Sequence, residues 1–157
     1  MGKFYRILFG ICLLTSINAC QTIPLSEQNT IHPDHQWNSA KPEKYFFNIT
    51  DTNQLYKIIF VIRHHNAYHY KNIWVELNHS SAGEKAQTET FNLNLADDQK
   101  GWLGTGMDDI YDQRIPLYSK PVKLNYGIHT FTIKHTMRED PLQNILSTGI
   151  RIEKAAL

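Results

Sequence analysis

Cys20 is the residue with the clearest chemistry in this sequence. It follows a basic opening with Lys3 and Arg6, an apolar run over residues 7–14 and a few small or polar residues. That order is typical of a bacterial lipoprotein signal, in which the thiol is acylated and cleavage leaves the cysteine as the new N-terminus. The apolar run is too short to span a bilayer as a helix. The sequence therefore predicts a lipoprotein signal peptide over residues 1–19 and lipidation at Cys20; the alternative is an ordinary signal peptide followed by a cysteine.

Acylation at Cys20 would hold the rest of the chain on a membrane. Each buried CH₂ group contributes about 0.8 kcal/mol, so three acyl chains make the attachment effectively permanent. Cys12 is the other cysteine of the sequence and leaves with the signal, so no disulfide is expected. Gln21 follows the acylated residue, and the first acidic residue after it is Glu27. By analogy with lipoprotein sorting, this favours the periplasmic side of the outer membrane over the inner membrane.

Aspartates gather in one segment, where their carboxylates could bind calcium. They are Asp97, Asp98, Asp108, Asp109 and Asp112. Gly104 and Gly106 lie between them and could let backbone carbonyls turn toward an ion, since calcium takes six to eight oxygen ligands. The spacing of an EF-hand is absent. The interpretation we adopt is a solvated loop whose carboxylates cap turns and strand ends, so neither a metal nor a cofactor is predicted.

Eight histidines also raise the question of a metal site. His64 and His65 are adjacent, so in a strand they point to opposite faces. His129 and His135 share a face, but six residues of strand separate them by about 20 Å, whereas a zinc–nitrogen bond is about 2 Å long. The segment 32–35 could bind a metal only adventitiously. We expect no histidine metal site.

The usual arrangements of catalytic residues are missing from the sequence. No serine lies in a Gly-x-Ser-x-Gly motif, and lipidation leaves no free thiol. Neither a paired acid and base nor a nucleophile with an aligned histidine can be recognised. We therefore assign no catalytic residue and expect a protein that is not an enzyme.

Aromatic residues in the long connection between Leu95 and Ile128 are candidates for binding, because exposed aromatic rings stack on sugars. They are Trp102, Tyr111, Tyr118 and Tyr126. The other interpretation is that they close the open end of the fold. We take Trp102 and Tyr111, with Asp109 and Asp112 beside them, as the candidate binding residues.

The chain without its signal is long enough for one domain. Removing residues 1–19 from 157 leaves 138, and the 16 Lys and Arg become 14 against 15 Asp and Glu. This balance gives no electrostatic footprint for nucleic acid. Residues 20–43 hold three prolines among polar residues and are predicted to be a flexible membrane-tethering stalk. The folded domain is then expected over residues 44–157.

Hydrophobic residues in that domain repeat with a period close to two, which is typical of strands. Strands are expected at 45–49, 55–63, 73–77, 88–95, 127–137 and 149–153. Residues 58–62 are apolar on both faces, as in a strand in the middle of a fold, and Trp74 is expected in the core. One short helical turn is expected over 141–145. The pattern predicts an all-β, antiparallel β-sandwich of jelly-roll type behind the lipidated stalk.

Several short motifs occur in an order that is similar to a known family. They are Arg63, the run 68–74 (YHYKNIW), 95–97 (LAD), 101–106 (GWLGTG), 109–112 (DIYD), 131–133 (FTI) and 149–153 (GIRIE). Together with the signal, this set resembles the gliding-motility lipoprotein GldH family of the Bacteroidota, over roughly residues 45–153. The resemblance implies a non-enzymatic accessory of the gliding and type IX secretion apparatus at the cell envelope, with other envelope proteins as partners.

Two functions of different classes follow from the sequence. The first is a lipid-anchored interaction subunit of the gliding or secretion machinery. The second is a lipid-anchored module that binds glycan or peptidoglycan, because sandwiches are common scaffolds for sugar recognition. The partner, the binding face and the oligomeric state are not encoded in any recognisable motif.

Overall fold

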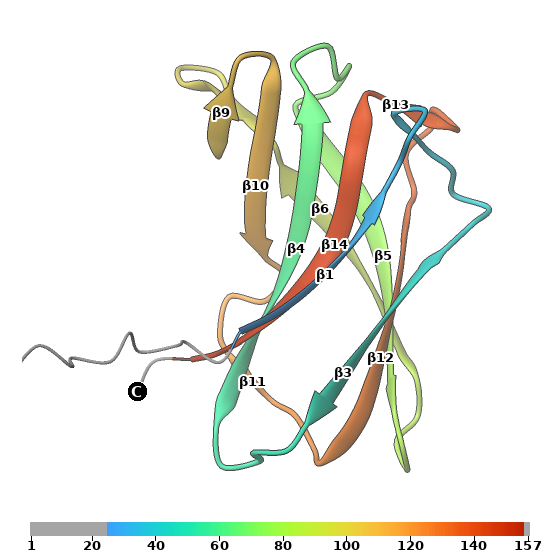
Figure 1. Ribbon diagram of the computed structural model, residues 1–157, viewed down its shortest axis with the longest axis vertical. Coiled ribbons are helices and arrows are strands. Elements are labelled where there is room, and N and C mark those ends of the chain that lie inside the picture. The colour runs from blue at the N-terminus through green and yellow to red at the C-terminus, as the bar shows by residue number, and fades with distance from the viewer. Residues whose placement is uncertain (1–24, 156–157) are drawn as a thin grey trace, which may run out of the picture.

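The computed structural model describes residues 25–155, which form two antiparallel sheets packed face to face (Figure 1). The strands are β1 (Leu25–Ile31), β2 (Gln36–Trp37), β3 (Glu43–Ile49), β4 (Leu55–His65), β5 (Asn72–Ser81), β6 (Gln87–Asn94), β7 (Ala96–Asp97), β8 (Gly101–Trp102), β9 (Thr105–Met107), β10 (Ile110–Pro116), β11 (Val122–Lys123), β12 (Gly127–His135), β13 (Leu142–Gln143) and β14 (Ile145–Lys154). None of these residues forms a helix of the length and apolarity needed to cross a membrane.

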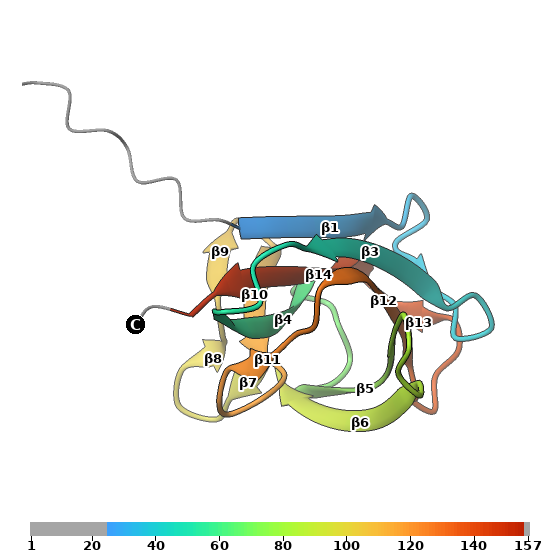
Figure 2. The same cartoon turned by 90° about the horizontal axis from the view of Figure 1, so that it is seen from below.

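The larger sheet has the strand order β1-β14-β4-β10-β9, and β11 also pairs with β4. The smaller sheet has the order β3-β12-β5-β6. Two further short pairs, β13 with β2 and β7 with β8, close parts of the edges. Figure 2 shows β5 and β6 on the side of the molecule opposite β1 and β14. The predicted all-β antiparallel sandwich is confirmed.

Strand β4 is the centre of the larger sheet, and its sequence explains why. It lies between β14 and β10, and Ile58, Phe60 and Ile62 point into the space between the sheets. The outward residues Ile59 and Val61 are also buried, as predicted from the apolar run. On that side Arg114 of β10 reaches Glu27 of β1, so their ion pair passes over β14 and β4.

The smaller sheet buries only its inner face. In β12, Phe131 and Ile133 are completely buried, while Thr130 and Thr132, which alternate with them, are half-buried on the outer face. In β5 the same alternation buries Ile73, Val75 and Leu77. Trp74 therefore points outward and is 42% exposed, so the prediction that it belongs to the core is wrong. The strand is apolar at three successive positions, so hydrophobicity alone does not show which of them face the core.

The predicted stalk over residues 20–43 is wrong for residues 25–43, because they already belong to the folded domain. Strand β1 pairs with β14 along its whole length, from Leu25 opposite Glu153 to Ile31 opposite Ser147. Trp37 in β2 is 1% exposed and stacks near Phe60. The polar composition of this segment suggested a linker, although residues 25–31 form an edge strand. Such a strand pairs through its backbone and needs few apolar side chains.

Side chains of β1 also bind the second sheet. The Gln28 amide nitrogen donates to the Phe46 carbonyl at 2.5 Å, and the Phe46 amide donates back to the Gln28 side-chain oxygen at 3.1 Å. These two hydrogen bonds resemble the pair exchanged by opposite residues of neighbouring β-strands, but here they connect the two sheets. Gly149 of β14 lies opposite Asn29, and a methyl group there would overlap the Asn29 side chain and the Gln28 carbonyl. Close approach of β1 to β14 therefore requires glycine at this position.

A buried polar cluster joins the two sheets beside β1. The Glu43 carboxylate accepts hydrogen bonds from the Thr148 and Tyr45 hydroxyls, both at 2.6 Å, and faces His32 Nε2 at 3.3 Å. Burial raises the pKa of Glu43 and lowers the pKa of His32, so each group shifts toward its neutral form. The cluster couples the chain after β1 to both β3 and β14.

The helical turn expected over 141–145 is wrong. Leu142 and Gln143 form β13, which pairs with β2 through Leu142 opposite Trp37. Leu142 and Ile145 are completely buried, and Asn144 between them has a positive φ of 65°. The pairing of β13 with β2 and the burial of Leu142 and Ile145 therefore outweigh the helical preference of this segment.

Truncating one inward and one outward aromatic residue of the smaller sheet tests this assignment of faces. We expect Phe131→Ala to lower the free energy of unfolding by about 3–5 kcal/mol, because the ring is completely buried. Trp74→Ala should cost about 1–2 kcal/mol, because much of the indole already contacts solvent. Urea unfolding of both variants measures the difference. Equal losses would contradict the outward orientation of Trp74.

Candidate functional site

The four predicted binding residues lie at the end of the sandwich where β4 finishes. Trp102 is in β8, Tyr111 and Asp112 are in β10, and Asp109 is in the turn between β9 and β10. This end also carries His65, the last residue of β4, and lies at the top of Figure 1, where β9 and β10 are labelled. The sheet separates the four residues into two groups, because neighbours along β10 point to opposite faces.

Trp102 and Tyr111 point inward and meet around His64. The His64 ring centroid is 4.7 Å from that of Trp102 and 5.8 Å from that of Tyr111. Tyr68 lies on another side of the same imidazole at 5.6 Å. His64 and Tyr68 are buried, and Trp102 and Tyr111 are half-buried. Of the two interpretations of these aromatics, closure of the open end therefore describes Trp102 and Tyr111 better than an exposed platform.

His64 is held as a neutral imidazole by its neighbours. Its Nδ1 is 3.0 Å from the His65 carbonyl and so donates, whereas Nε2 accepts from the Gln113 side-chain amide at 3.2 Å. The Gln113 amide also donates to the Leu95 carbonyl at 2.9 Å, which fixes its orientation. Protonation of His64 Nε2 would place its N–H against the N–H of the Gln113 amide, with no acceptor between the two donors. Burial lowers the pKa of His64, in agreement with this geometry.

Asp112 points outward from the same strand and binds Arg63. The guanidinium donates two hydrogen bonds, from Nε at 2.7 Å and from Nη2 at 2.9 Å. Hydrogen bonding to Arg63 holds the pKa of Asp112 below its usual range. Asp109 accepts from the Asn66 side chain at 2.6 Å, and its other oxygen is 3.9 Å from His65 Nε2. Both carboxylates therefore fix the turn between β9 and β10 against the end of β4.

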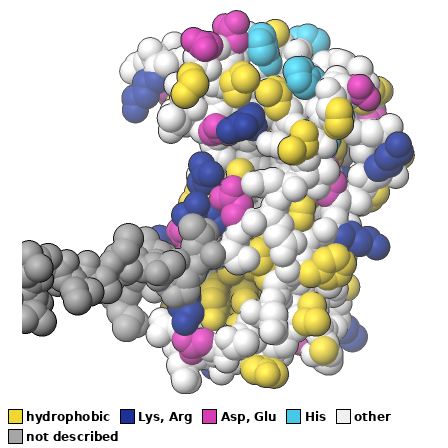
Figure 3. Space-filling view, viewed as in Figure 1, with side chains coloured by type: hydrophobic (Ala, Val, Ile, Leu, Met, Phe, Trp, Pro, Cys, Tyr) yellow, Lys and Arg dark blue, Asp and Glu magenta, His cyan; other side chains and the backbone are white. Residues whose placement is uncertain are grey.

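Exposed apolar side chains lie beside these ion pairs. Met107 is 78% exposed and lies directly opposite Ile110, which in turn lies opposite His65 on β4. These residues and the Arg63–Asp112 pair share the outward face of β9, β10 and β4. We call this surface the distal patch; its members are Arg63, His65, Met107, Ile110 and Asp112. Figure 3 shows hydrophobic, acidic and histidine side chains together at this end of the molecule.

Two glycines permit the tight hairpin that presents Met107. A methyl group on Gly104 would overlap the Asp112 carbonyl and the Gln113 side chain, and Gly104 has a positive φ of 88°. A methyl group on Gly106 would press on the Tyr111 ring. These residues therefore serve close packing of β9 on β10, rather than the turning of carbonyls toward an ion.

The aspartates considered for calcium are engaged separately. Asp98 pairs with Lys71, and Asp97 accepts from the backbone amides of Gln99 and Lys100. Within residues 25–155, no three His, Cys, Asp or Glu side chains are grouped so that they could hold a metal ion.

The histidines are dispersed over the fold, but two of them form a pair. His79 Nε2 is 2.8 Å from His129 Nδ1, and His129 Nε2 is 2.9 Å from the Asn125 carbonyl. His129 must donate to that carbonyl, so its Nδ1 accepts and His79 donates. Burial, with the neighbouring His129 ring, lowers the pKa of His79. No local motif indicates this pair, because its members are 50 positions apart in the chain.

The other two aromatic residues of the long connection, Tyr118 and Tyr126, have different surroundings. Tyr118 packs edge-on against Phe91 and donates to Glu89 at 2.6 Å. Tyr126 is 74% exposed and lies just before β12, at the opposite end of the sandwich from Trp102. The aromatic residues therefore form no single platform.

Sequence reasoning missed three members of this end of the molecule. His64 could have been found from its position in a strand that is apolar on both faces. Met107 and Ile110 lacked a signal, because isolated apolar residues in a glycine-rich loop indicate neither burial nor exposure. Chemically, the end offers a rigid aromatic interior, fixed ion pairs and an exposed apolar rim, which suit binding of a protein surface.

Comparison with known proteins gives the family. The family model described as GldH lipoprotein matches residues 25–152, which is most of the chain and coincides with the folded part. This chain belongs to the GldH lipoprotein family. A relative from Christiangramia forsetii, described as a gliding motility lipoprotein GldH homolog, is 24% identical over 129 residues, covering 77% of this chain and 79% of the relative.

Membership agrees with the predicted lipoprotein character and with the predicted link to gliding motility. The family is one of gliding-motility lipoproteins and is not a known family of enzymes. As a lipoprotein, the chain is associated with a membrane. Cys20 and the signal over residues 1–19 lie outside the described residues, and the match begins at residue 25, so lipidation at Cys20 stays a prediction.

The neutral state of His64 predicts a pH dependence of stability. Because its pKa is lowered by folding, the unfolded chain binds a proton more readily, and stability is lost as the pH falls below about 6.5. We expect His64→Gln to flatten this loss between pH 7.5 and 5.5, by at most about 1.4 kcal/mol per pH unit. Urea unfolding at both pH values measures it.

Tyr68→Phe is the matched control, because it alters the same aromatic cluster and leaves His64 in place. The opposite contribution of Glu43, whose pKa is raised, is common to all variants and cancels in the comparison. An unchanged slope in His64→Gln would contradict the assignment.

Proposed function

We propose that this chain is a lipid-anchored, non-enzymatic interaction subunit of the gliding-motility and type IX secretion machinery. Acylated Cys20 holds it on the periplasmic side of the envelope, in the outer membrane rather than the inner one. The distal patch binds another envelope protein of the machinery. Family membership supports the process, and the arrangement of the described residues supports the role of the patch.

The observation that carries the proposal is the position of the distal patch relative to the tether. The described chain begins at Leu25, opposite Glu153, which lies opposite Lys57 near the start of β4. His65 ends the same strand, eight residues after Lys57, so the patch lies about 26 Å further along the sandwich at 3.3 Å per residue. An anchor at one end and an exposed apolar surface at the other suit a subunit that presents a binding site away from a membrane.

The chemistry of the patch favours a protein partner. Met107 and Ile110 supply apolar area, and the Arg63–Asp112 pair supplies fixed donors and acceptors at its edge. Apolar residues at the centre with polar residues around them are the usual composition of protein interfaces. A sugar would require an exposed aromatic face, and Trp102 and Tyr111 turn theirs toward His64.

The anchor is tested by removing its thiol. We expect Cys20→Ala to abolish incorporation of a fatty-acid analogue, because acylation needs this sulfur. Cys12→Ala is the matched control and should keep the label, since Cys12 lies within the predicted signal. Metabolic labelling followed by gel analysis decides between them. Undiminished label in Cys20→Ala would refute the lipoprotein anchor at this position.

The patch is tested by placing charge on its apolar side chains. Met107→Lys with Ile110→Lys should weaken partner binding about 30-fold or more, as expected when hot-spot residues worth about 2 kcal/mol are lost, and should reduce colony spreading. Ile128→Lys is the control, because Ile128 is 61% exposed on another surface. Protein level and anchoring are monitored in each strain.

Photocrosslinking from position 107 in intact envelopes identifies the partner, and position 128 serves as the control. Recovery of an envelope protein at 107 alone supports the proposal. Normal spreading of the double variant, or retention of the chain on purified peptidoglycan or polysaccharide through this end, would favour the glycan-binding alternative instead.

A further inference from the structure

We infer that the tethered end of the larger sheet is a docking surface for the anionic headgroups of the membrane that holds the anchor. The surface consists of Leu55, Lys57 and Lys123, beside the start of β1. The inference rests on the proposed anchoring at Cys20. It adds an orientation: the sandwich contacts the bilayer through this surface, rather than swinging freely at the end of a stalk.

The length of chain between the anchor and the fold is the first argument. Five residue steps separate Cys20 from Leu25, and an extended chain spans at most about 3.6 Å per residue, so the Cα atoms are within about 18 Å. Leu25 lies opposite Glu153, and Glu153 lies opposite Lys57. Lys57 is thus two strand spacings, about 10 Å, from the point where the tether enters the fold. This end of the sheet cannot move far from the bilayer surface.

The composition of the surface is the second argument. Leu55 is 48% exposed, although β4 is otherwise the most buried strand of its sheet. Lys57 is the next residue on the same outward face, and Lys123 of β11 lies opposite Leu55. An exposed apolar side chain flanked by two lysines is a combination that suits a bilayer interface, since the apolar group enters the headgroup layer and the ammonium groups meet phosphates.

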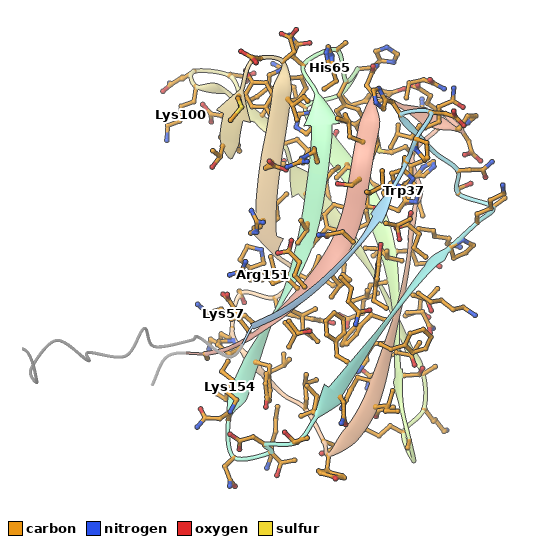
Figure 4. The ribbon with its side chains drawn as sticks, in the orientation of Figure 1. Trp37, Lys57, His65, Lys100, Arg151 and Lys154 are labelled. Carbon is orange, nitrogen blue, oxygen red and sulfur yellow. The ribbon has the colours of Figure 1, made fainter. Side chains whose placement is uncertain are left out.

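Ion pairing around the surface leaves positive charge in excess. Glu27 and Glu153 are both bound by Arg151, and Glu27 also by Arg114, so that these four residues balance. Asp51 is bound by Lys154 at 2.7 Å. Among the residues that the structure describes, Lys57 and Lys123 take part in no ion pair. Figure 4 shows Lys57 and Lys154 at the side where β1 begins, and Lys100 and His65 at the other end.

The short tether allows a surface of only three residues to bind the membrane. Each lysine near an anionic membrane contributes little alone, but a short tether converts contact with the bilayer into an intramolecular event at high effective concentration. Two lysines and one leucine are then sufficient to orient the domain. In the resulting orientation the distal patch lies at the far end of β4 from the residues that contact the bilayer.

The experiment uses the mature lipoprotein in vesicles of phosphatidylcholine, with or without phosphatidylglycerol. Because Cys20 is acylated and Cys12 is removed, an introduced cysteine is the single free thiol. Leu55→Cys and Met107→Cys each carry a fluorophore, and the lipids include one with a nitroxide on its headgroup. We expect strong quenching at position 55 in vesicles with phosphatidylglycerol, weaker quenching without it, and little at position 107 in either.

Charge variants test the recognition of headgroups. Lys57→Gln and Lys123→Gln should each lower the ratio of contacting to free molecules about fivefold in anionic vesicles. Lys100→Gln is the matched control at the far end and should leave the ratio unchanged. Quenching that is equal at positions 55 and 107, or equal with and without phosphatidylglycerol, would overturn the inference.

Flotation of the same vesicles separates the inference from the proposed function. Protein that floats with the lipid while position 55 is not quenched keeps the anchor and refutes the docking surface. Protein that does not float refutes the anchor itself, and the docking surface with it. Floating protein with selective, anionic-lipid-dependent quenching at position 55 supports both.

Discussion

The pairing of β14 with β1 is the constraint on which the rest of this structure depends. It brings the first and last strands of the fold side by side and completes the sheet on one side of β4. Gly149 permits the close approach, and Gln28 extends the contact to β3 in the other sheet. The buried cluster of Glu43, Tyr45 and Thr148 adds a second connection between the sheets nearby. Because β1 is docked in this way, the chain leaves the fold at a fixed place, and the two ends of β4 acquire different surroundings.

Those two ends have different chemistry on the same outward face. At the start of β4, Leu55 and Lys57 lie beside the entry of the chain; at its end, Arg63 and His65 join Met107 and Ile110 in an exposed apolar patch with fixed ion pairs. Rigid ion pairs contribute little to stability when exposed, but they fix side-chain positions before a partner arrives. The aromatic cluster around His64 supports this end from within. A sandwich with such a polarity suits a spacer between a membrane and a protein partner, which agrees with membership of the GldH lipoprotein family.

Much of the fold could be predicted because the hydrophobic pattern has a clear period. The alternation in β3 and β12 and the double-sided run in β4 gave the sandwich and most of its core. Three errors have physical causes. Strand β1 is held by backbone pairing and polar side chains, so its composition resembled that of a linker. Trp74 is apolar but lies out of phase with its buried neighbours, and residues 142–143 pair with β2 instead of forming a turn of helix. The four candidate residues lie at one end of the sandwich. Which of them point outward and which inward follows from strand phase and from pairings across 43 to 49 residues, which no local motif encodes.

The sandwich is expected to stand on the membrane through the start of β4, with the distal patch at the far end of that strand. Neutron reflectometry of the lipidated chain on a supported bilayer that contains phosphatidylglycerol measures this most directly, because it gives the protein density along the membrane normal. We expect protein density that begins at the headgroups without a solvent gap and extends at least about 33 Å, the length of β4. A layer of solvent between headgroups and protein, or a thin layer in which β4 lies parallel to the bilayer, would contradict it.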